Sequence, residues 1–198
     1  LWIVVALAFG VATLGAVGTA RDAVLDALDR DAAALMGGDV SLDTTGAPIP
    51  PEERFGVIPA DARTSDVVRA NTIVTSPAGE ELTVALMGVD GAYPLYGEVR
   101  LAPAMPLDQA LADGGIVVAP GVLERLDVAL GDRLRIGEAD FTIRTTLVAA
   151  PDRTGGAFQI GPRVITRLGD LGATGILREG SLARYSTRIA LPPEMNGA

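Results

Sequence analysis

The first twenty residues contain no charged side chain, and this feature constrains the chain more than any other. As a helix, LWIVVALAFGVATLGAVGTA would reach about 30 Å, the thickness of the hydrocarbon core of a membrane. A secretory signal peptide is the alternative, because Gly18 and Ala20 are small enough for a cleavage site. The apolar run is longer than such a peptide usually carries. We therefore expect residues 1–20 to form a transmembrane helix.

Residues 21–38 continue with a helical period. Leu25, Leu28 and Leu35 recur on one side, and Gly37-Gly38 ends the pattern. This predicts an amphipathic stalk with the three leucines on its apolar side; the family resemblance described below implies that they contact a partner stalk. The flank 21–31 carries two Arg and four Asp, so it lacks the basic enrichment of a cytoplasmic flank. We expect the residues after about 21 to lie in the periplasm or outside the cell.

The rest of the chain alternates short strands and short helices, which predicts an α+β domain of one or two lobes. Strands are expected at 39–43, within 67–90 on both sides of a turn at 77–79, at 93–103, at 116–120, within 133–151 as a hairpin about Gly137-Glu138, and at 184–191. Helices are expected at 106–115, at 121–130 and near 164–171. Residues 44–51 are expected to be a turn and linker, and 51–66 at most a weak helix.

The composition excludes several chemistries. The chain has no Cys and no His, and all of its 16 basic residues are Arg. Catalytic triads, zinc sites built on Cys and His, and the lysine of an ATP-binding loop are therefore absent. The formal charge of −9 disfavours a nucleic-acid partner. We expect no catalytic residue, no cofactor and no metal site.

The charged residues offer few candidates for a site. The paired acids Glu52-Glu53, Glu80-Glu81 and Asp29 with Asp31 are typical of a solvated surface rather than of general acid and base catalysis. Arg133 and Arg135 share one face of a predicted strand. They either bind an anionic head group or form the solvent face of a hairpin.

Several stretches together resemble the extracytoplasmic region of FtsX/MacB-type ABC transporter permeases, and most closely their YbbP-like subgroup. They are GGDVSL, MGVDGAYPLYGEVRL (87–101), GGIVVAPGVLERLDVALGDRLRIGEADFTI (114–143), AAPDRTGGAFQIGPRVI (149–165) and LGATGILREGSLARYSTRIAL (171–191). Each stretch alone is a loose motif, but their order and spacing are specific. The resemblance covers nearly all of residues 1–191.

This resemblance implies a MacB-like periplasmic domain in a bacterial inner-membrane permease. Residues 39–90 are similar to the first half of a porter-like βαβ lobe, residues 91–183 to an inserted, mostly β lobe called Sabre, and residues 184–198 to the returning strand and a linker. Such permeases have three further membrane helices, and the porter lobe continues beyond the returning strand. We therefore expect the chain to be a fragment with an exposed sheet edge.

The resemblance also implies function and partners. A separate cytoplasmic ATPase hydrolyses ATP, and the stalks pass the movement to the periplasmic domain, which acts on lipid, lipoprotein or another lipophilic substrate. The expected partners are that ATPase, the other membrane helices, membrane lipid and a periplasmic protein. Two alternatives stay open: a membrane-anchored regulatory module of the FtsX kind that activates a cell-wall hydrolase, and a secreted enzyme with an acidic site.

Particular residues match the family's motifs, and we expect all of them to be structural. Tyr93, Pro94, Tyr96 and Gly97 match the junction between the lobes. The remaining matches are Gly131 and Asp132 in the turn before the hairpin, where glycine permits a positive φ, and Asp152, Gly155 and Gly156 in the loop after it.

Overall fold

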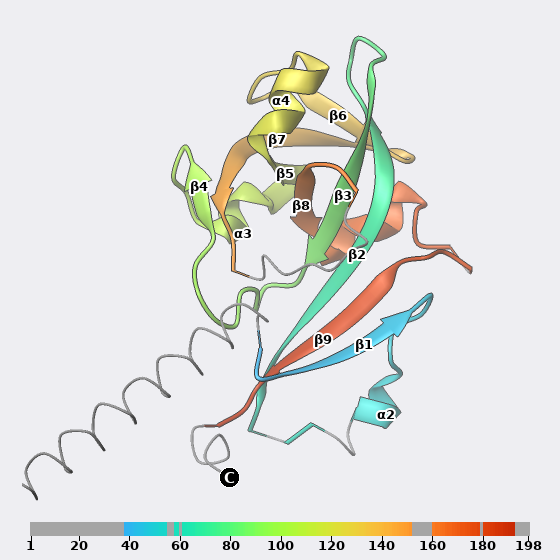
Figure 1. Cartoon of the computed structure of the whole chain (residues 1–198), viewed down its shortest axis with the longest axis vertical. Coiled ribbons are helices and arrows are strands. Elements are labelled where there is room, and N and C mark those ends of the chain that lie inside the picture. The colour runs from blue at the N-terminus through green and yellow to red at the C-terminus, as the bar shows by residue number, and fades with distance from the viewer. Residues whose placement is uncertain (1–37, 55–57, 60, 152–159, 179, 193–198) are drawn as a thin grey trace, which may run out of the picture.

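The computed structural model describes residues 38–54, 58–59, 61–151, 160–178, 180–192 (Figure 1). The strands are β1 (Val40–Thr45), β2 (Arg63–Thr75), β3 (Glu81–Val89), β4 (Arg100–Ala102), β5 (Gly115–Val118), β6 (Arg133–Ile136), β7 (Ala139–Ala149), β8 (Arg163–Arg167) and β9 (Arg184–Ala190). The helices are α2 (Pro51–Arg54), α3 (Leu107–Ala110) and α4 (Pro120–Leu126), with 3₁₀ turns η1 (Ala112–Gly114) and η2 (Leu168–Thr174). The predicted α+β class is confirmed.

Six of the strands form a closed ring of backbone pairing. Around the ring, β2 pairs with β3, β3 with β8, β8 with β5, β5 with β7, and β7 with β6, which pairs back onto β2. The pairs β3/β8 and β5/β7 are parallel, and the others in the ring are antiparallel. The two-residue contact between β6 and β2 closes the sheet into a small barrel.

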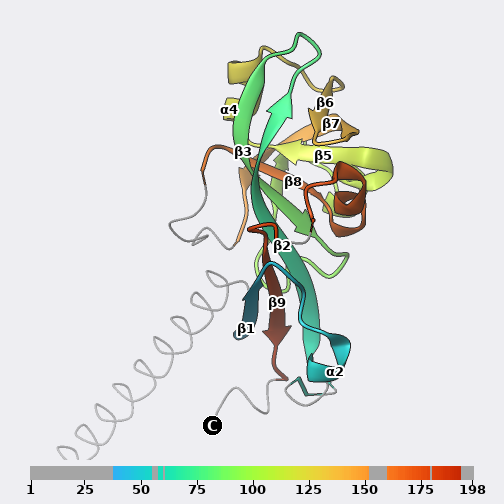
Figure 2. The same ribbon diagram turned by 90° about the vertical axis from the view of Figure 1, so that its right-hand side faces the viewer.

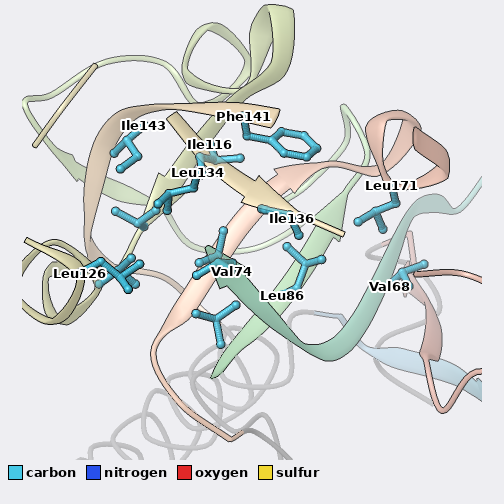
Figure 3. Packing of buried hydrophobic residues seen from close by; sticks show 14 of the residues in the cluster. Val68, Val74, Leu86, Ile116, Leu126, Leu134, Ile136, Phe141, Ile143 and Leu171 are labelled. Atoms are coloured by element: carbon cyan, nitrogen blue, oxygen red, sulfur yellow. The ribbon is translucent and has the colours of Figure 1, made fainter. Parts of the chain in front are cut away.

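The interior of this barrel is filled with aliphatic side chains. All six strands contribute to one buried cluster, which includes Val74, Leu86, Ile116 and Leu134 (Figure 3). Helix α4 adds Leu126 and η2 adds Leu171. Because burial of each such side chain is worth about 1.5–3 kcal/mol, this cluster is the main source of the barrel's stability.

A second buried cluster lies on the opposite, outer face of β2, β3, β5 and β8. Adjacent residues alternate between the two, so that Val67, Met87 and Ile165 belong to the outer cluster while their neighbours Val68 and Leu86 face the barrel interior. The outer cluster is covered by α3 and by the chain that joins β3 to β4. The barrel wall is therefore buried on both sides here.

Below the barrel, three strands continue as an open sheet that we call the base. It consists of β1, β9 and residues 63–69 of β2, with β9 in the middle and antiparallel to both neighbours (Figure 2). Strand β2 is thirteen residues long and runs from the base into the barrel. The expected border between the two lobes is at residue 90. Strands on the two sides of that border are hydrogen-bonded to each other, because β3 pairs with β8 and β2 with β6.

Most predicted elements are confirmed. Strands at 39–43 and 184–191, the pair within 67–90, the strand at 116–120 and the hairpin about Gly137-Glu138 are present as β1, β9, β2/β3, β5 and β6/β7. The weak helix of 51–66 is limited to α2, and β2 begins at Arg63 rather than at 67. The helix expected over 106–115 is split at Leu111 into α3 and η1, and Asp113 within η1 has a left-handed φ of 50°.

Three predictions were wrong. The segment near 164–171 is not helical at its start, since 163–167 forms β8, where Val164, Ile165 and Thr166 are all buried. The strand expected over 93–103 exists only at Arg100–Ala102. The helix expected over 121–130 stops at Leu126, because Asp127 is left-handed with a φ of 48°.

The predicted span at 1–20 and the stalk leucines Leu25, Leu28 and Leu35 lie outside the described residues. Within the part of the chain that is described, no helix is long and apolar enough to cross a membrane.

Candidate functional site

The base buries several polar side chains within its three strands. Ser65, Ser186, Thr187 and Arg188 are all buried there. Buried polar groups persist only where they are hydrogen-bonded or otherwise compensated, so their contacts define what the base holds together. Four aspartates accept these contacts, with Asp39, Asp43 and Asp90 on one face of the base and Asp66 on the other.

Asp39 connects the start of β1 to the end of β9. Its backbone N–H donates to the carbonyl of Ile189 at 2.9 Å, and its Oδ2 accepts the backbone N–H of Leu191 at 2.8 Å. The same Oδ2 accepts the hydroxyl of Tyr96 at 2.7 Å. One carboxylate oxygen therefore links the start of β1, the residue after β9 and a loop 57 residues away in the sequence.

Asp90 fixes the beginning of that loop to β2. Its Oδ1 accepts the hydroxyl of Ser65 at 2.7 Å and the backbone N–H of Ala92 at 3.1 Å. Its Oδ2 accepts the backbone N–H of Asp66 at 2.7 Å. Hydrogen bonds to a charged acceptor are stronger than neutral ones, so three of them hold this position firmly.

Between these two points, Tyr93 packs against the middle strand. Its ring is 6% exposed, and the guanidinium carbon of Arg188 lies 6.0 Å from the ring centroid. Arg188 is itself 4% exposed, so this cation–π contact is largely shielded from solvent. We call residues 90–97 the clasp, because they contact β2 through Asp90, β9 through Tyr93, and Asp39, directly before β1, through Tyr96.

The opposite face of the base holds α2. The guanidinium of Arg54 donates from Nη1 to both oxygens of Asp66, at 3.1 and 2.9 Å. Thr187 on β9 donates its hydroxyl to Oδ1 of Asp66 at 2.6 Å. Asp66 thus joins α2, β2 and β9. On the face that carries Arg188, Asp43 accepts the hydroxyl of Ser186 and joins β1 to β9.

The predicted motif residues divide into three groups. Tyr93, Pro94 and Gly97 come together in the clasp, where the Tyr93-Pro94 bond is cis and Gly97 has a φ of 73°. Gly131 and Asp132 lie apart from it, in the turn before β6. Asp152, Gly155 and Gly156 lie outside the described residues.

The turn before β6 has the predicted geometry. Gly131 has a φ of 95°, a conformation that residues with a Cβ rarely adopt. Oδ2 of Asp132 accepts the backbone N–H of Ala129 at 2.8 Å, which ties the turn to the end of the α4 region. These contacts are of the kind that stabilise a turn.

The two arginines on β6 are exposed, and Arg135 pairs with Asp140 across the hairpin at 3.2 Å. This agrees with the solvent face of a hairpin. Among the described residues, no group of three or more carboxylates could hold a metal ion. The observed carboxylates of the base act as hydrogen-bond acceptors that join strands.

Sequence reasoning missed Asp39, Asp90 and Arg188. Asp39 directly precedes β1 and Asp90 directly follows β3. Neither belongs to a recognisable motif, and their partners are distant in the chain. Arg188 left a weak signal, because it interrupts a strand in which five consecutive residues from Ser186 are buried. Only the tertiary structure shows what an arginine does in such a position.

No protein-family model matches the chain. Over 178 residues, or 89% of its length, the chain is 29% identical to an Escherichia coli (strain K12) protein described as an uncharacterized ABC transporter permease YbbP. The chain spans 21% of the length of that protein. The resemblance to FtsX/MacB-type permeases predicted from the sequence is confirmed by this relative.

Solved structures extend the comparison. The extracellular domain of the noncanonic ABC-type transporter YknZ from Gram-positive bacteria matches with a TM-score of 0.51 at 11% identity, over 75% of this chain and 76% of that one. This likeness shows a shared fold. The periplasmic region of MacB from Actinobacillus actinomycetemcomitans has a TM-score of 0.48 at 10% identity, over 81% of this chain and 80% of that one.

Proposed function

We propose that, like the permeases it resembles, this chain supplies the extracytoplasmic domain of an ABC transporter in a bacterial inner membrane. Cytoplasmic ATP hydrolysis on a separate subunit drives movement of this domain, which handles or exports a lipid, a lipoprotein or another lipophilic substrate. The domain itself is not an enzyme. The support is the YbbP relative together with the geometry of the base.

The observation that carries this proposal is the position of the first and last strands of the described domain. Asp39 and Leu191 are hydrogen-bonded to each other at 2.8 Å, and β1 and β9 are direct neighbours. A domain inserted between two membrane segments must present both of its ends to the membrane, and neighbouring first and last strands place them together. Movement of those segments then enters the domain through β1 and β9 together.

The proposal assigns roles to the flanking parts. Residues 1–20 span the membrane, 21–38 form the stalk, and Leu25, Leu28 and Leu35 contact a partner stalk. In domain terms, 39–90 and 184–198 form the porter-like part and 91–183 the inserted part. The partners are the ATPase, the other membrane helices of the same permease, membrane lipid and a periplasmic protein.

The absence of cysteine from the chain allows a direct test of location. Leu182 is 91% exposed, so Leu182→Cys should react with a membrane-impermeant maleimide in intact cells or spheroplasts. Val118→Cys is the matched control, because Val118 is fully buried and should react only after denaturation. Labelling of Leu182→Cys that requires lysis of the inner membrane would contradict the proposal.

A further inference from the structure

We propose that Arg133, Thr142 and Arg144 form a binding site for a phosphate group, on the outer face of the barrel where β6 pairs with β7. The inference rests on the proposed function, in which the substrate is lipophilic. It adds that the head group of this substrate carries a phosphate. The site is built from two exposed arginines and a half-buried threonine on two neighbouring strands.

The pairing of the two strands places the three side chains next to one another. Arg133 on β6 lies directly opposite Thr142 on β7, and opposite residues of antiparallel strands have their Cβ atoms about 4.5–5.5 Å apart on the same face. Arg144 follows two residues after Thr142, so it is a diagonal neighbour of Arg133, within reach of a long side chain. The adjacent residues Leu134 and Ile143 are buried in the barrel interior, so the three side chains lie on the outer face.

The position of Arg144 is set by an irregularity in the pairing of β7 with β5. Ile116 lies opposite Ile143 and Val117 lies opposite Thr145, so Arg144 is the extra residue of a β-bulge. A bulge re-aims the side chain that it carries, and bulges are over-represented next to functional sites. Arg144 is exposed although both of its neighbours in the strand are buried.

The aliphatic part of Arg144 lies against a glycine. A Cβ atom on Gly115 would be 2.9 Å from Cγ of Arg144 and 2.1 Å from the carbonyl oxygen of Ala110. A side chain at position 115 would therefore displace the arginine. Glycine leaves the room that this position of Arg144 requires.

Neither arginine of the site is neutralised by a carboxylate in the part of the chain that is described. Asp140 lies on the same face, but its carboxylate pairs with Arg135 at 3.2 Å. Arg133 and Arg144 form no ion pair with any described residue, and the hydroxyl of Thr142 forms no hydrogen bond with one. Because like charges this close repel each other, a bound anion would stabilise the arrangement.

A phosphate group fits these donors better than a carboxylate does. Guanidinium groups bind phosphate oxygens through paired, charge-assisted hydrogen bonds. A phosphate monoester offers three strong acceptor oxygens, which can meet both guanidinium groups and the Thr142 hydroxyl together. A carboxylate has only two oxygens for the same three donors.

The test is isothermal titration calorimetry on the purified full chain in a non-ionic detergent at low salt. The two probes are inorganic phosphate and dihexanoylphosphatidic acid, and the wild-type protein should bind both. Arg133→Gln and Arg144→Gln should each weaken binding about tenfold, because each removes charge-assisted hydrogen bonds. Thr142→Val keeps the shape of the side chain and should weaken binding about fivefold.

Arg125→Gln is the matched control. Arg125 on α4 is another exposed arginine that forms no ion pair with a described residue. The variant loses the same charge far from the site in sequence and should bind both probes like the wild type. Thermal unfolding of each variant checks that the exposed substitutions leave the domain folded.

The two probes distinguish the sources of the phosphate. Binding of both probes that weakens in the arginine variants supports the site, and so does weakened binding of the lipid probe alone. Binding of inorganic phosphate alone would overturn the assignment to a lipid head group. If neither probe binds, or if all variants bind like the wild type, the site is wrong. The proposed function would still stand, because labelling of Leu182→Cys tests it separately.

Discussion

At the scale of single residues, the contacts that organise this domain come from side chains with several simultaneous partners. Asp39 and Asp90 each accept more than one donor from distant parts of the chain. Glycines contribute differently, because without a side chain they allow another segment of the backbone to approach closely. Gly137, in the turn between β6 and β7, has a φ of 61°, and a Cβ there would lie 2.0 Å from the carbonyl oxygen of Thr174.

We therefore expect Gly137→Ala to destabilise the domain strongly. The methyl group would push apart the turn and η2, which are joined by the Glu138 N–H to Thr174 hydrogen bond at 2.9 Å. The expected loss in free energy of unfolding is about 3 kcal/mol. Thermal unfolding of the purified chain in detergent, followed by circular dichroism, measures it.

Gly79→Ala provides the comparison, because Gly79 has a similarly positive φ of 89° with nothing within 4 Å of its Cβ position. Gly79→Ala should therefore report backbone strain alone, with a loss in free energy of unfolding of about 1 kcal/mol. Equal losses for the two variants would mean that the contact between the turn and η2 does not matter.

These two glycines also show what a sequence can predict at this scale. Both were expected in turns, because glycine between alternating strands is a local signal. The close approach of Gly137 to Thr174 was not predictable, since the partner is 37 residues away and has no local signature. The same reason hid Asp39 and Asp90, whereas Tyr93, Pro94 and Gly97 were found through family resemblance.

At the scale of elements, strands were predicted well where alternation is clear, as in β6 and β7. β8 was missed because VIT within a mixed segment fits a short helix as well as a buried strand. Its pairing with β3 and β5 decides the outcome, and that pairing is non-local. The closure of the barrel by β6 was unpredictable for a similar reason, because it depends on two residue pairs with β2.

The hairpin β6/β7 should be essential to the barrel. Leu134 on β6 is fully buried in the interior cluster, so Leu134→Ala should lower the free energy of unfolding by about 2–5 kcal/mol. Leu130→Ala serves as its control, since Leu130 is 42% exposed and should lose less than about 1 kcal/mol. Urea unfolding of the full chain in detergent measures both, and similar losses would argue against a closed interior at β6.

At the scale of the whole molecule, the domain is a barrel joined to a base by one long strand. β2 belongs to both parts, and the clasp adds a second connection through Tyr96 and Asp39. The start of β1 and the end of β9 meet at the base, far along β2 from the β2/β3 turn (Figure 2). This arrangement suits a domain that receives movement at one end.

The most direct measurement compares two fluorescent labels in the purified permease with its ATPase. Val40→Cys lies at the start of β1 and is 41% exposed, and Ile73→Cys lies at the far end of β2 and is 51% exposed. Each would carry an environment-sensitive label such as bimane. We predict that ATP changes the fluorescence at Val40 and leaves that at Ile73 unchanged. If ATP is hydrolysed and the label at Val40 does not respond, the base does not receive the movement and the account is wrong.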